Sequence, residues 1–189
     1  MEYDEIQKYF DILDKAKIEN CIDKLLLINI NLSACWIWDR FGVSFQIRIN
    51  HVELNEDEVI KYLKIMLSKG FDIDTYLLSD LDKSNLTLLH LFSSHNIVKV
   101  MSFLIDNGAD INKQTRDGKT PFMKMLESIA NYNKLDKDIV VKFINKGLDL
   151  KLKDNFNKDI TDHIYKYLNM GEQKIIFDIF NKYHIKINF

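Results

Sequence analysis

The feature that most constrains this chain is a spacing of thirty-three residues between two similar stretches, at Thr87 and Thr120. The first stretch, residues 85–90, reads Asn-Leu-Thr-Leu-Leu-His, and the second, residues 117–122, reads Asp-Gly-Lys-Thr-Pro-Phe. Between them an apolar run ends at residues 104–112, which read Leu-Ile-Asp-Asn-Gly-Ala-Asp-Ile-Asn. A fixed period of this length is typical of a chain built from stacked copies of one supersecondary unit. We therefore expect one unit to close and its successor to open within this stretch.

These motifs resemble ankyrin repeats, whose period is also thirty-three residues. In that family a threonine at the start of the first helix and a histidine three residues later bond to each other and to the backbone, and Thr87 and His90 occupy these places. Pro121 stands at the first helical position of the next unit, where proline forfeits no hydrogen bond. The resemblance implies an all-α fold, an ankyrin-repeat solenoid of stacked helix-turn-helix units with short finger turns.

The same pattern divides the rest of the chain. Asp39, Gly42 and Ser44 match the opening of an earlier unit, with serine in place of threonine. In a last unit, Asn157 stands for the turn glycine and Asp159 for the threonine. We expect a single ankyrin-repeat domain over residues 1–189. Its expected parts are an N-terminal helical cap (1–34), three repeats (35–81, 82–114 and 115–153) and a C-terminal capping repeat (154–189).

Apolar residues at helical spacing predict the helices, and glycines predict where they end. Gly70, Gly108 and Gly147 follow apolar stripes, and glycine can close a helix in the left-handed conformation without a steric penalty. The predicted stripes are Val59, Tyr62, Leu63 and Met66, then Ile97, Val100, Met101, Leu104 and Ile105, then Ile164, Tyr165 and Leu168, then Ile175, Ile176, Phe177 and Phe180.

Two units are longer than the one that opens at Thr87. The extra residues of the first fall most naturally between its helices, where residues 43–54 alternate enough to fit either a helix or a strand. The extra residues of the third lie near Ser128 to Leu135. The form of residues 43–54 stays open here.

Composition indicates a folded chain and disfavours some partners. With 47% apolar residues, the 189-residue chain can bury a core unaided. Its 26 Lys and Arg against 28 Asp and Glu give a net charge of -2, which offers no electrostatic footprint for nucleic acid or an anionic membrane. Cys21 and Cys35 lack CxxC spacing, and neither a signal peptide nor a membrane span is recognisable. We therefore expect a cytoplasmic protein.

No motif predicts chemistry or a cofactor. The five histidines are scattered, and no two have the i, i+4 spacing beside an acidic residue that a helical zinc site needs. The phosphate-binding glycine motifs and the nucleophile-elbow motif are absent. We therefore expect no catalytic residue, no metal and no cofactor.

The resemblance also implies where a partner binds. Each ankyrin unit sends out a finger ahead of its first helix, and the fingers and the exposed side of first helices form a concave binding face. Exposed aromatic residues and arginine most often anchor protein interfaces. By position, the expected partner-binding residues are Trp38, Arg40 and Phe41, then Lys83, Ser84 and His95, then Arg116, Asp117, Lys119 and Glu127, then Asn155, Phe156, Lys158 and Tyr167. Two alternatives stay open: Trp38 and Phe41 could pack on the cap, and the 128–135 insert could be the main contact surface.

The leading hypothesis is a non-enzymatic module that binds another protein and is a monomer when unbound. A sharper form is a cytosolic immunity or inhibitor protein that occupies a toxin's active site. A viral or bacterial host-modulating ankyrin protein would suit the sequence equally well. A different class is an enzyme or enzyme subunit with a site in the divergent N-terminal third, for which the aromatic run from Trp36 to Phe45 is the only motive.

Overall fold

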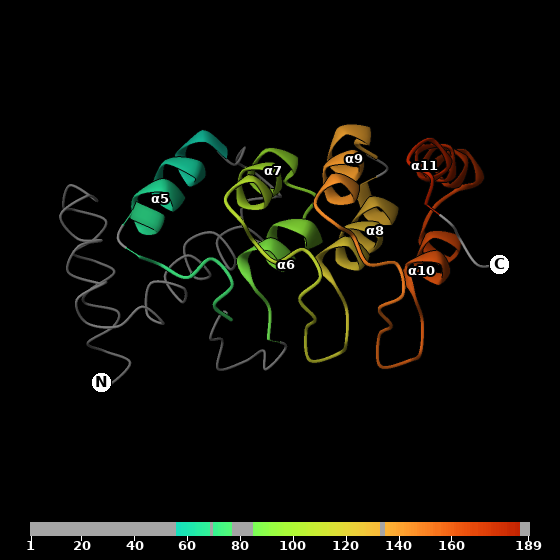
Figure 1. Ribbon diagram of the computed structural model, residues 1–189, viewed down its shortest axis with the longest axis horizontal. Coiled ribbons are helices and arrows are strands. Elements are labelled where there is room, and N and C mark those ends of the chain that lie inside the picture. The colour runs from blue at the N-terminus through green and yellow to red at the C-terminus, as the bar shows by residue number, and fades with distance from the viewer. Residues whose placement is uncertain (1–55, 69, 77–84, 133–134, 186–189) are drawn as a thin grey trace. The chain divides into compact units, whose positions relative to one another are not determined.

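The computed structural model describes residues 56–68, 70–76, 85–132 and 135–185 (Figure 1). Every regular element in these residues is a helix, which confirms the predicted all-α class. The helices are α5 (Glu56–Ser68), α6 (Leu88–Ser94), α7 (Val98–Asp106), α8 (Pro121–Tyr132), α9 (Lys137–Asn145), α10 (Ile160–Tyr167) and α11 (Met170–Lys182).

The chain divides into two compact units between Asp82 and Lys83, and each unit is considered by itself. The predicted cap at 1–34, the unit opening at Asp39 to Ser44 and the alternative at 43–54 all lie outside the described residues.

Helix α5, in the first unit, buries three residues of the stripe predicted for it, and the side chain of the fourth, Tyr62, lies outside the described part. The side chains of Val59, Leu63 and Met66 are each 1% exposed, because their i, i+4 and i+7 spacing places them on one side of the helix. Gly70 then takes a φ of 85°, and the Phe71 N–H donates to the Met66 carbonyl at 3.1 Å. Gly70 was predicted to end this helix, and this bond shows that it does.

The start of α6 shows the predicted bond between Thr87 and His90. The Thr87 Oγ1 lies 2.8 Å from the His90 Nδ1, and the His90 Nδ1 accepts the backbone N–H of Thr87 at 3.2 Å. The His90 Nε2 lies 3.0 Å from the Lys113 carbonyl and 3.2 Å from the Lys119 carbonyl. Because carbonyls only accept, Nε2 carries the proton and ties the opening of one unit to the finger of the next.

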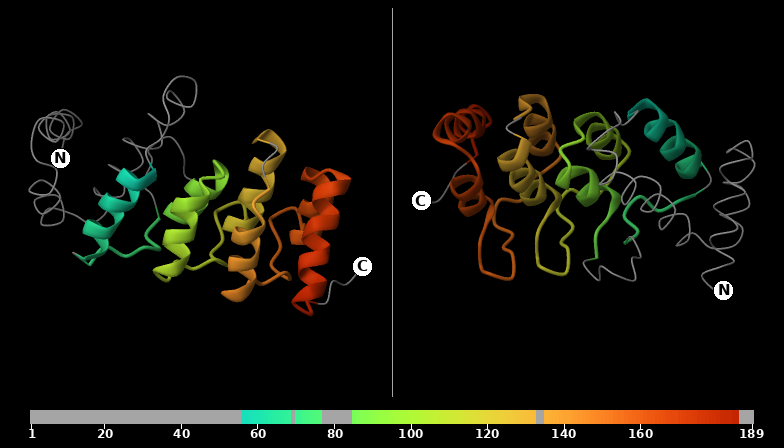
Figure 2. Two further views of the ribbon diagram at one scale, coloured as in Figure 1. Left: turned by 90° about the horizontal axis from the view of Figure 1, so that it is seen from above. Right: turned by 180° about the vertical axis from the view of Figure 1, so that it is seen from behind.

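The second unit, residues 83–189, is a stack of helix pairs in two rows (Figures 1 and 2). The first helices α6, α8 and α10 form one row, with α8 between its neighbours, and α7, α9 and α11 form the other. The Ser128 Oγ of α8 donates to the Ser93 carbonyl of α6 at 3.0 Å. Phe122 of α8 meets Phe143 of α9 edge to face, with ring centroids 5.1 Å apart, inside the third repeat.

Four helices of this stack end in the same way. In α7 the Ala109 N–H donates to the Leu104 carbonyl across a glycine with positive φ. This pairing satisfies a carbonyl that the end of the helix would otherwise leave without a donor. The equivalent bonds in the other three are Ile97 N–H to Phe92, Leu148 N–H to Phe143 and Ile185 N–H to Phe180. Asn96 and His184 replace glycine at two of these ends, with φ of 53° and 56°.

The extra length of the third repeat is largely helical. Helix α8 has 12 residues whereas α6 has 7, so part of the predicted 128–135 insert continues the first helix. Residues 133–134 lie outside the described part, and Asp136 caps α9 by accepting the N–H groups of Asp138 and Ile139.

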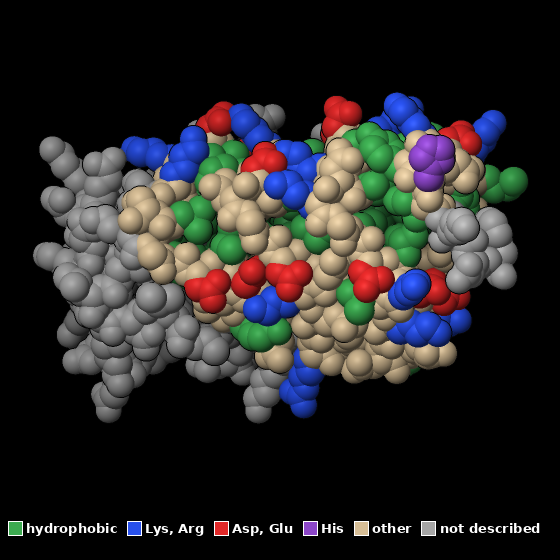
Figure 3. Space-filling view, in the orientation of Figure 1, with side chains coloured by type: hydrophobic (Ala, Val, Ile, Leu, Met, Phe, Trp, Pro, Cys, Tyr) green, Lys and Arg blue, Asp and Glu red, His purple; other side chains and the backbone are tan. Residues whose placement is uncertain are grey.

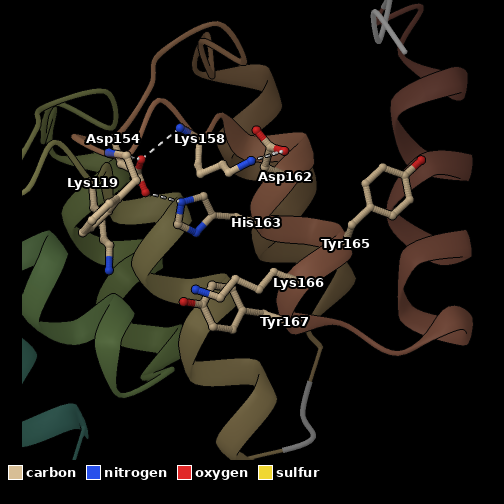
Figure 4. Close-up of a pocket in the computed structure, with 9 residues that line it drawn as sticks. Lys119, Asp154, Lys158, Asp162, His163, Tyr165, Lys166 and Tyr167 are labelled. Atoms are coloured by element: carbon tan, nitrogen blue, oxygen red, sulfur yellow. Dashed lines mark hydrogen bonds and ion pairs between the residues drawn. The ribbon is translucent and has the colours of Figure 1, made fainter.

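The stripe predicted at Ile164, Tyr165 and Leu168 is wrong in one residue. Ile164 and Leu168 are buried, but Tyr165 is 50% exposed. Figure 4 shows its ring directed toward α11, where it lies 5.5 Å from the ring of Phe177. Tyr165 therefore packs at the edge of the helix pair and not in the core.

Candidate functional site

Two fingers lie side by side below the helices in Figure 1. We name residues 113–120 finger A and residues 152–159 finger B. In finger A the Thr115 N–H donates to the Lys119 carbonyl at 2.9 Å, and the Gly118 N–H donates to the Thr115 carbonyl at 2.9 Å. The Thr115 Oγ1 also donates to the Asp117 carboxylate. The finger is thus a tight turn fastened by its own threonine.

Finger B repeats this turn with a carboxylate in the place of the threonine. The Asp154 Oδ1 accepts the N–H groups of Phe156 and Lys158, both at 2.9 Å. The Asp154 Oδ2 lies 3.0 Å from the Nε2 of His163 on α10. Asp154 therefore fastens the turn and also joins it to the helix that follows.

The two fingers are bonded to each other. The Asn155 N–H donates to the Asp117 carbonyl at 3.0 Å, and the Asn155 Nδ2 donates to the Arg116 carbonyl at 2.9 Å. The Gln114 Nε2 donates to the Lys153 carbonyl at 2.9 Å. One of these three bonds joins two backbone atoms, and the other two run from the side chains of Asn155 and Gln114 to backbone carbonyls. The bonds therefore fix the spacing of the two finger backbones.

A polar cluster links α8 to α10 above the fingers. The Lys119 Nζ donates to the Glu127 Oε1 at 2.6 Å, and the same oxygen lies 4.0 Å from the His163 Nδ1. The side chains of His163 and Asp154 are each 4% exposed. Since the carboxylate of Asp154 accepts, the His163 Nε2 donates, and among the described residues the His163 Nδ1 has no hydrogen-bond partner.

Burial and bonding act in opposite directions on the charges of this cluster. Burial raises the pKa of the Asp154 carboxyl, but the N–H of Lys158 and the ring of His163 outweigh it, so the pKa is lowered. Burial lowers the pKa of the Lys119 ammonium, but its bond to Glu127 outweighs this, so the pKa is raised. Both groups are therefore charged at neutral pH.

A pocket of about 550 Å³ opens between finger B and α10 (Figure 4). Asp154 and His163 form its buried side, and Lys119 reaches it from finger A. The Lys166 Nζ lies 4.7 Å from the centre of the Tyr167 ring, a cation–π contact. The other residues that line it are Phe156, Lys158, Asp162 and Tyr165.

The structure brings together most of the described residues that were predicted to bind a partner. Arg116, Asn155, Phe156 and Lys158 are exposed on the fingers, while Asp117, Lys119, Glu127 and Tyr167 are half-buried beside them. His95 is half-buried at the end of α6, where its Nδ1 donates to the Leu91 carbonyl at 2.9 Å. Trp38, Arg40, Phe41, Lys83 and Ser84 lie outside the described residues.

Sequence reasoning missed the pair of Asp154 and His163. A signal was present, because a polar residue stands at the equivalent place of three successive units, namely Asp82, Thr115 and Asp154. A histidine four residues into the next helix is a natural partner for such a carboxylate. Although both residues line the pocket, each side chain is only 4% exposed, and Asp154 is bonded to two backbone N–H groups and to His163, so the pair supports the structure of finger B.

The described residues offer little else for chemistry. They contain no group of three His, Cys, Asp or Glu side chains that could hold a metal ion. No helix among them combines the length and the apolarity that crossing a membrane requires. The expectations of no metal and no cofactor stay predictions.

Comparison with known families matches residues 84–116 to the ankyrin repeat. The matched segment contains α6, α7 and the first part of finger A, and thus the unit that opens at Thr87. No curated protein matches the chain. Together with the stacked helix pairs, the match confirms the predicted ankyrin-repeat solenoid.

Proposed function

Because the chain is an ankyrin-repeat protein, and such stacks offer extended concave surfaces to other proteins, we propose that it is a non-enzymatic interaction module that binds a protein partner on its fingers and first helices. Ankyrin repeats are typically interaction modules without catalytic activity. The proposed face consists of fingers A and B with the adjoining sides of α6, α8 and α10.

The bonding between the fingers is the observation that carries this proposal. Asn155 and Gln114 fasten the backbone of one finger to the next, so the fingers do not have to be ordered when a partner arrives. A preorganised surface binds more tightly because little conformational entropy is lost on association. Phe156, which is 77% exposed, projects from this rigid row. An exposed aromatic ring on a rigid support is a typical interface anchor.

The pocket beside finger B adds to the same face. It places the aromatic ring of Tyr167 beside charged groups, so a partner side chain could be enclosed there and not merely touched. Fully desolvated pockets near the centre of an interface contribute most of the binding energy.

The proposal is tested with alanine variants once a partner has been isolated. We expect Arg116→Ala, Phe156→Ala and Tyr167→Ala each to weaken binding by about 2 kcal/mol or more, which is about thirtyfold. Lys137→Ala and Lys174→Ala are matched controls, because both lysines are exposed on the second helices α9 and α11. We expect these controls to leave the affinity unchanged.

Thermal melting of each variant separates binding from folding. Anchor variants that bind like the wild type contradict the proposed face. So does a loss of affinity that merely follows a loss of stability, and the exposed end of α8 at the 128–135 insert then becomes the next candidate.

The finer roles stay predictions. An inhibitor that occupies a toxin's active site and a host-modulating ankyrin protein would use the same face. The identity of the neighbouring gene distinguishes them, because an immunity protein is expected beside its toxin. The enzyme alternative concerns the N-terminal third, which lies outside the described residues.

A further inference from the structure

On the proposed binding face, acidic side chains are mostly buried and bonded within the chain, whereas several basic side chains are exposed. Fingers A and B with helices α8 and α10 contain five acidic residues, and each is buried or half-buried. Their carboxylates are bonded within the chain: Asp117 to Thr115, Glu127 to Lys119, Asp154 to His163, Asp159 to the N–H of Thr161, and Asp162 to the N–H of Asp159. The carboxylates of this face therefore serve mainly in hydrogen bonds and ion pairs within the chain.

The exposed charges of the same segments are all positive. They are Arg116 on finger A, Lys153 and Lys158 on finger B, and Lys166 on α10. The Lys158 Nζ lies 3.4 Å from the Asp162 carboxylate, a surface pair of the kind that contributes little. The Lys166 Nζ rests on the Tyr167 ring. The outward charge of the face is thus basic although the whole chain carries a net charge of -2.

The aromatic groups lie among these basic residues. Phe156 stands between Lys153 and Lys158 on finger B, and Tyr167 follows Lys166 on α10. The pocket joins the two positions, since Phe156, Lys158, Lys166 and Tyr167 all line it. A ligand that fills this pocket meets an apolar wall and ammonium groups together (Figure 4).

We propose that the partner of this face is a protein that presents an acidic segment, with carboxylates placed at Arg116, Lys153, Lys158 and Lys166 and one apolar side chain against Phe156 and Tyr167. This inference rests on the proposed function and adds the chemistry of the partner. Complementary charges steer association and select among partners more than they raise affinity. The pocket supplies the part of the affinity that charge alone does not.

A protein segment fits this face better than RNA or a membrane. Figure 3 shows one side of the molecule, on which acidic and basic side chains are interspersed over the described part. The half-exposed carboxylates of Asp117 and Asp162 would lie against a continuous row of phosphates and repel it. A peptide can place its own carboxylates at the lysines and leave neutral residues opposite the aspartates.

Selection of peptides from a random display library on the immobilised full chain tests the proposal. We expect the selected sequences to be enriched in Asp and Glu around one aromatic or aliphatic residue. Lys158→Glu and Lys166→Glu should each weaken binding of a selected peptide about tenfold, which corresponds to about 1.4 kcal/mol. Lys137→Glu and Lys174→Glu, which make the same change of charge on the second helices, should change it less than about twofold, because charges far from the site are screened. Added salt should weaken binding to the wild type.

The other outcomes overturn the proposal in distinguishable ways. Selected peptides that are neutral or basic, and that lose affinity in Phe156→Ala but not in Lys158→Glu, leave the binding face standing and refute its acidic ligand. Peptides that respond to neither variant, or the failure to select any peptide, refute the face itself. Single-stranded RNA or phosphatidylserine vesicles that bind more tightly than the selected peptides, and that no longer bind Lys166→Glu, would assign the basic residues to a polyanion.

Discussion

A single methyl group, added at Gly118, is expected to break the hydrogen bonds between fingers A and B. Gly118 lies in finger A with a φ of 79°, and a Cβ added there would lie 2.9 Å from the backbone nitrogen of Asn155 and 2.9 Å from the Cα of Asp154. Both are backbone atoms of finger B and cannot rotate aside as a side chain does. Gly118→Ala therefore forces the fingers apart.

The cost of Gly118→Ala has two parts. A residue with a Cβ loses about 1–2 kcal/mol in the left-handed region. Separating the fingers also removes the two hydrogen bonds from Asn155 to the carbonyls of Asp117 and Arg116, each with a net contribution of about 1 kcal/mol. We expect a total loss of about 3–4 kcal/mol, which leaves a domain of ordinary stability folded.

Gly108→Ala is the matched control. Gly108 has a φ of 90°, but a Cβ there would meet nothing within 4 Å. This variant should therefore lose only the conformational part of the free energy of unfolding, about 1–2 kcal/mol. The difference between the two variants, about 2 kcal/mol, measures how strongly the fingers are joined.

Urea unfolding of the two variants, followed by circular dichroism, gives both free energies of unfolding. Unchanged slopes would show that the comparison is between equally cooperative transitions. Equal losses in Gly108→Ala and Gly118→Ala would refute the reasoning, because the close approach to finger B would then carry no energy. A partner assay on Gly118→Ala would further show whether the spacing of the fingers matters for binding.

Two further predictions concern stability. Burial lowers the pKa of His90 to about 4 in the folded state, against 6.5 in the unfolded chain. The stability that the neutral His90 ring contributes is therefore complete above pH 6.5 and is lost as the pH falls toward 4. We expect the free energy of unfolding to fall by about 3 kcal/mol across this range, and His90→Gln, compared by urea unfolding at several pH values, should remove that part of the pH dependence; equal pH dependence in both proteins would contradict it. Asp154→Ala should cost about 2–4 kcal/mol, because two backbone N–H groups of finger B and the His163 ring lose a buried acceptor. Hydrogen exchange should accelerate at those two amides and not at finger A, and protection equal to the wild type would count against the role given to Asp154.

The sequence was most informative where a particular backbone conformation or local hydrogen bond calls for one type of residue. Gly108 was predicted to close a helix because few residues tolerate its φ, and the bond of Thr87 with His90, three residues apart, was predicted from the resemblance to ankyrin repeats. Asn157, in the place of the turn glycine, also has a positive φ, 61°. Such requirements are met within a few residues, so the order of residues is enough to reveal them.

The sequence was less informative where the outcome depends on what a neighbouring element covers. Tyr165 follows the helical spacing of a core residue, but its exposure depends on the position of α11. The bond between Asp154 and His163 depends on how finger B turns back toward α10. The division of charge on the binding face depends on which carboxylates find partners, and composition reports only a net charge of -2.

The hydrogen bonds between neighbouring repeats have a consequence for synthesis of the chain. In residues 83–189 they join positions such as His90 with Lys119 and Ser102 with Lys142, which are 29 and 40 residues apart. Chains whose contacts are close in sequence fold rapidly, and domains begin to fold from the N-terminal side as they are made. Each repeat can therefore dock on its predecessor while the ribosome is still translating the next one. An apolar repeat face is then left uncovered only for the few seconds that about forty residues take to be made.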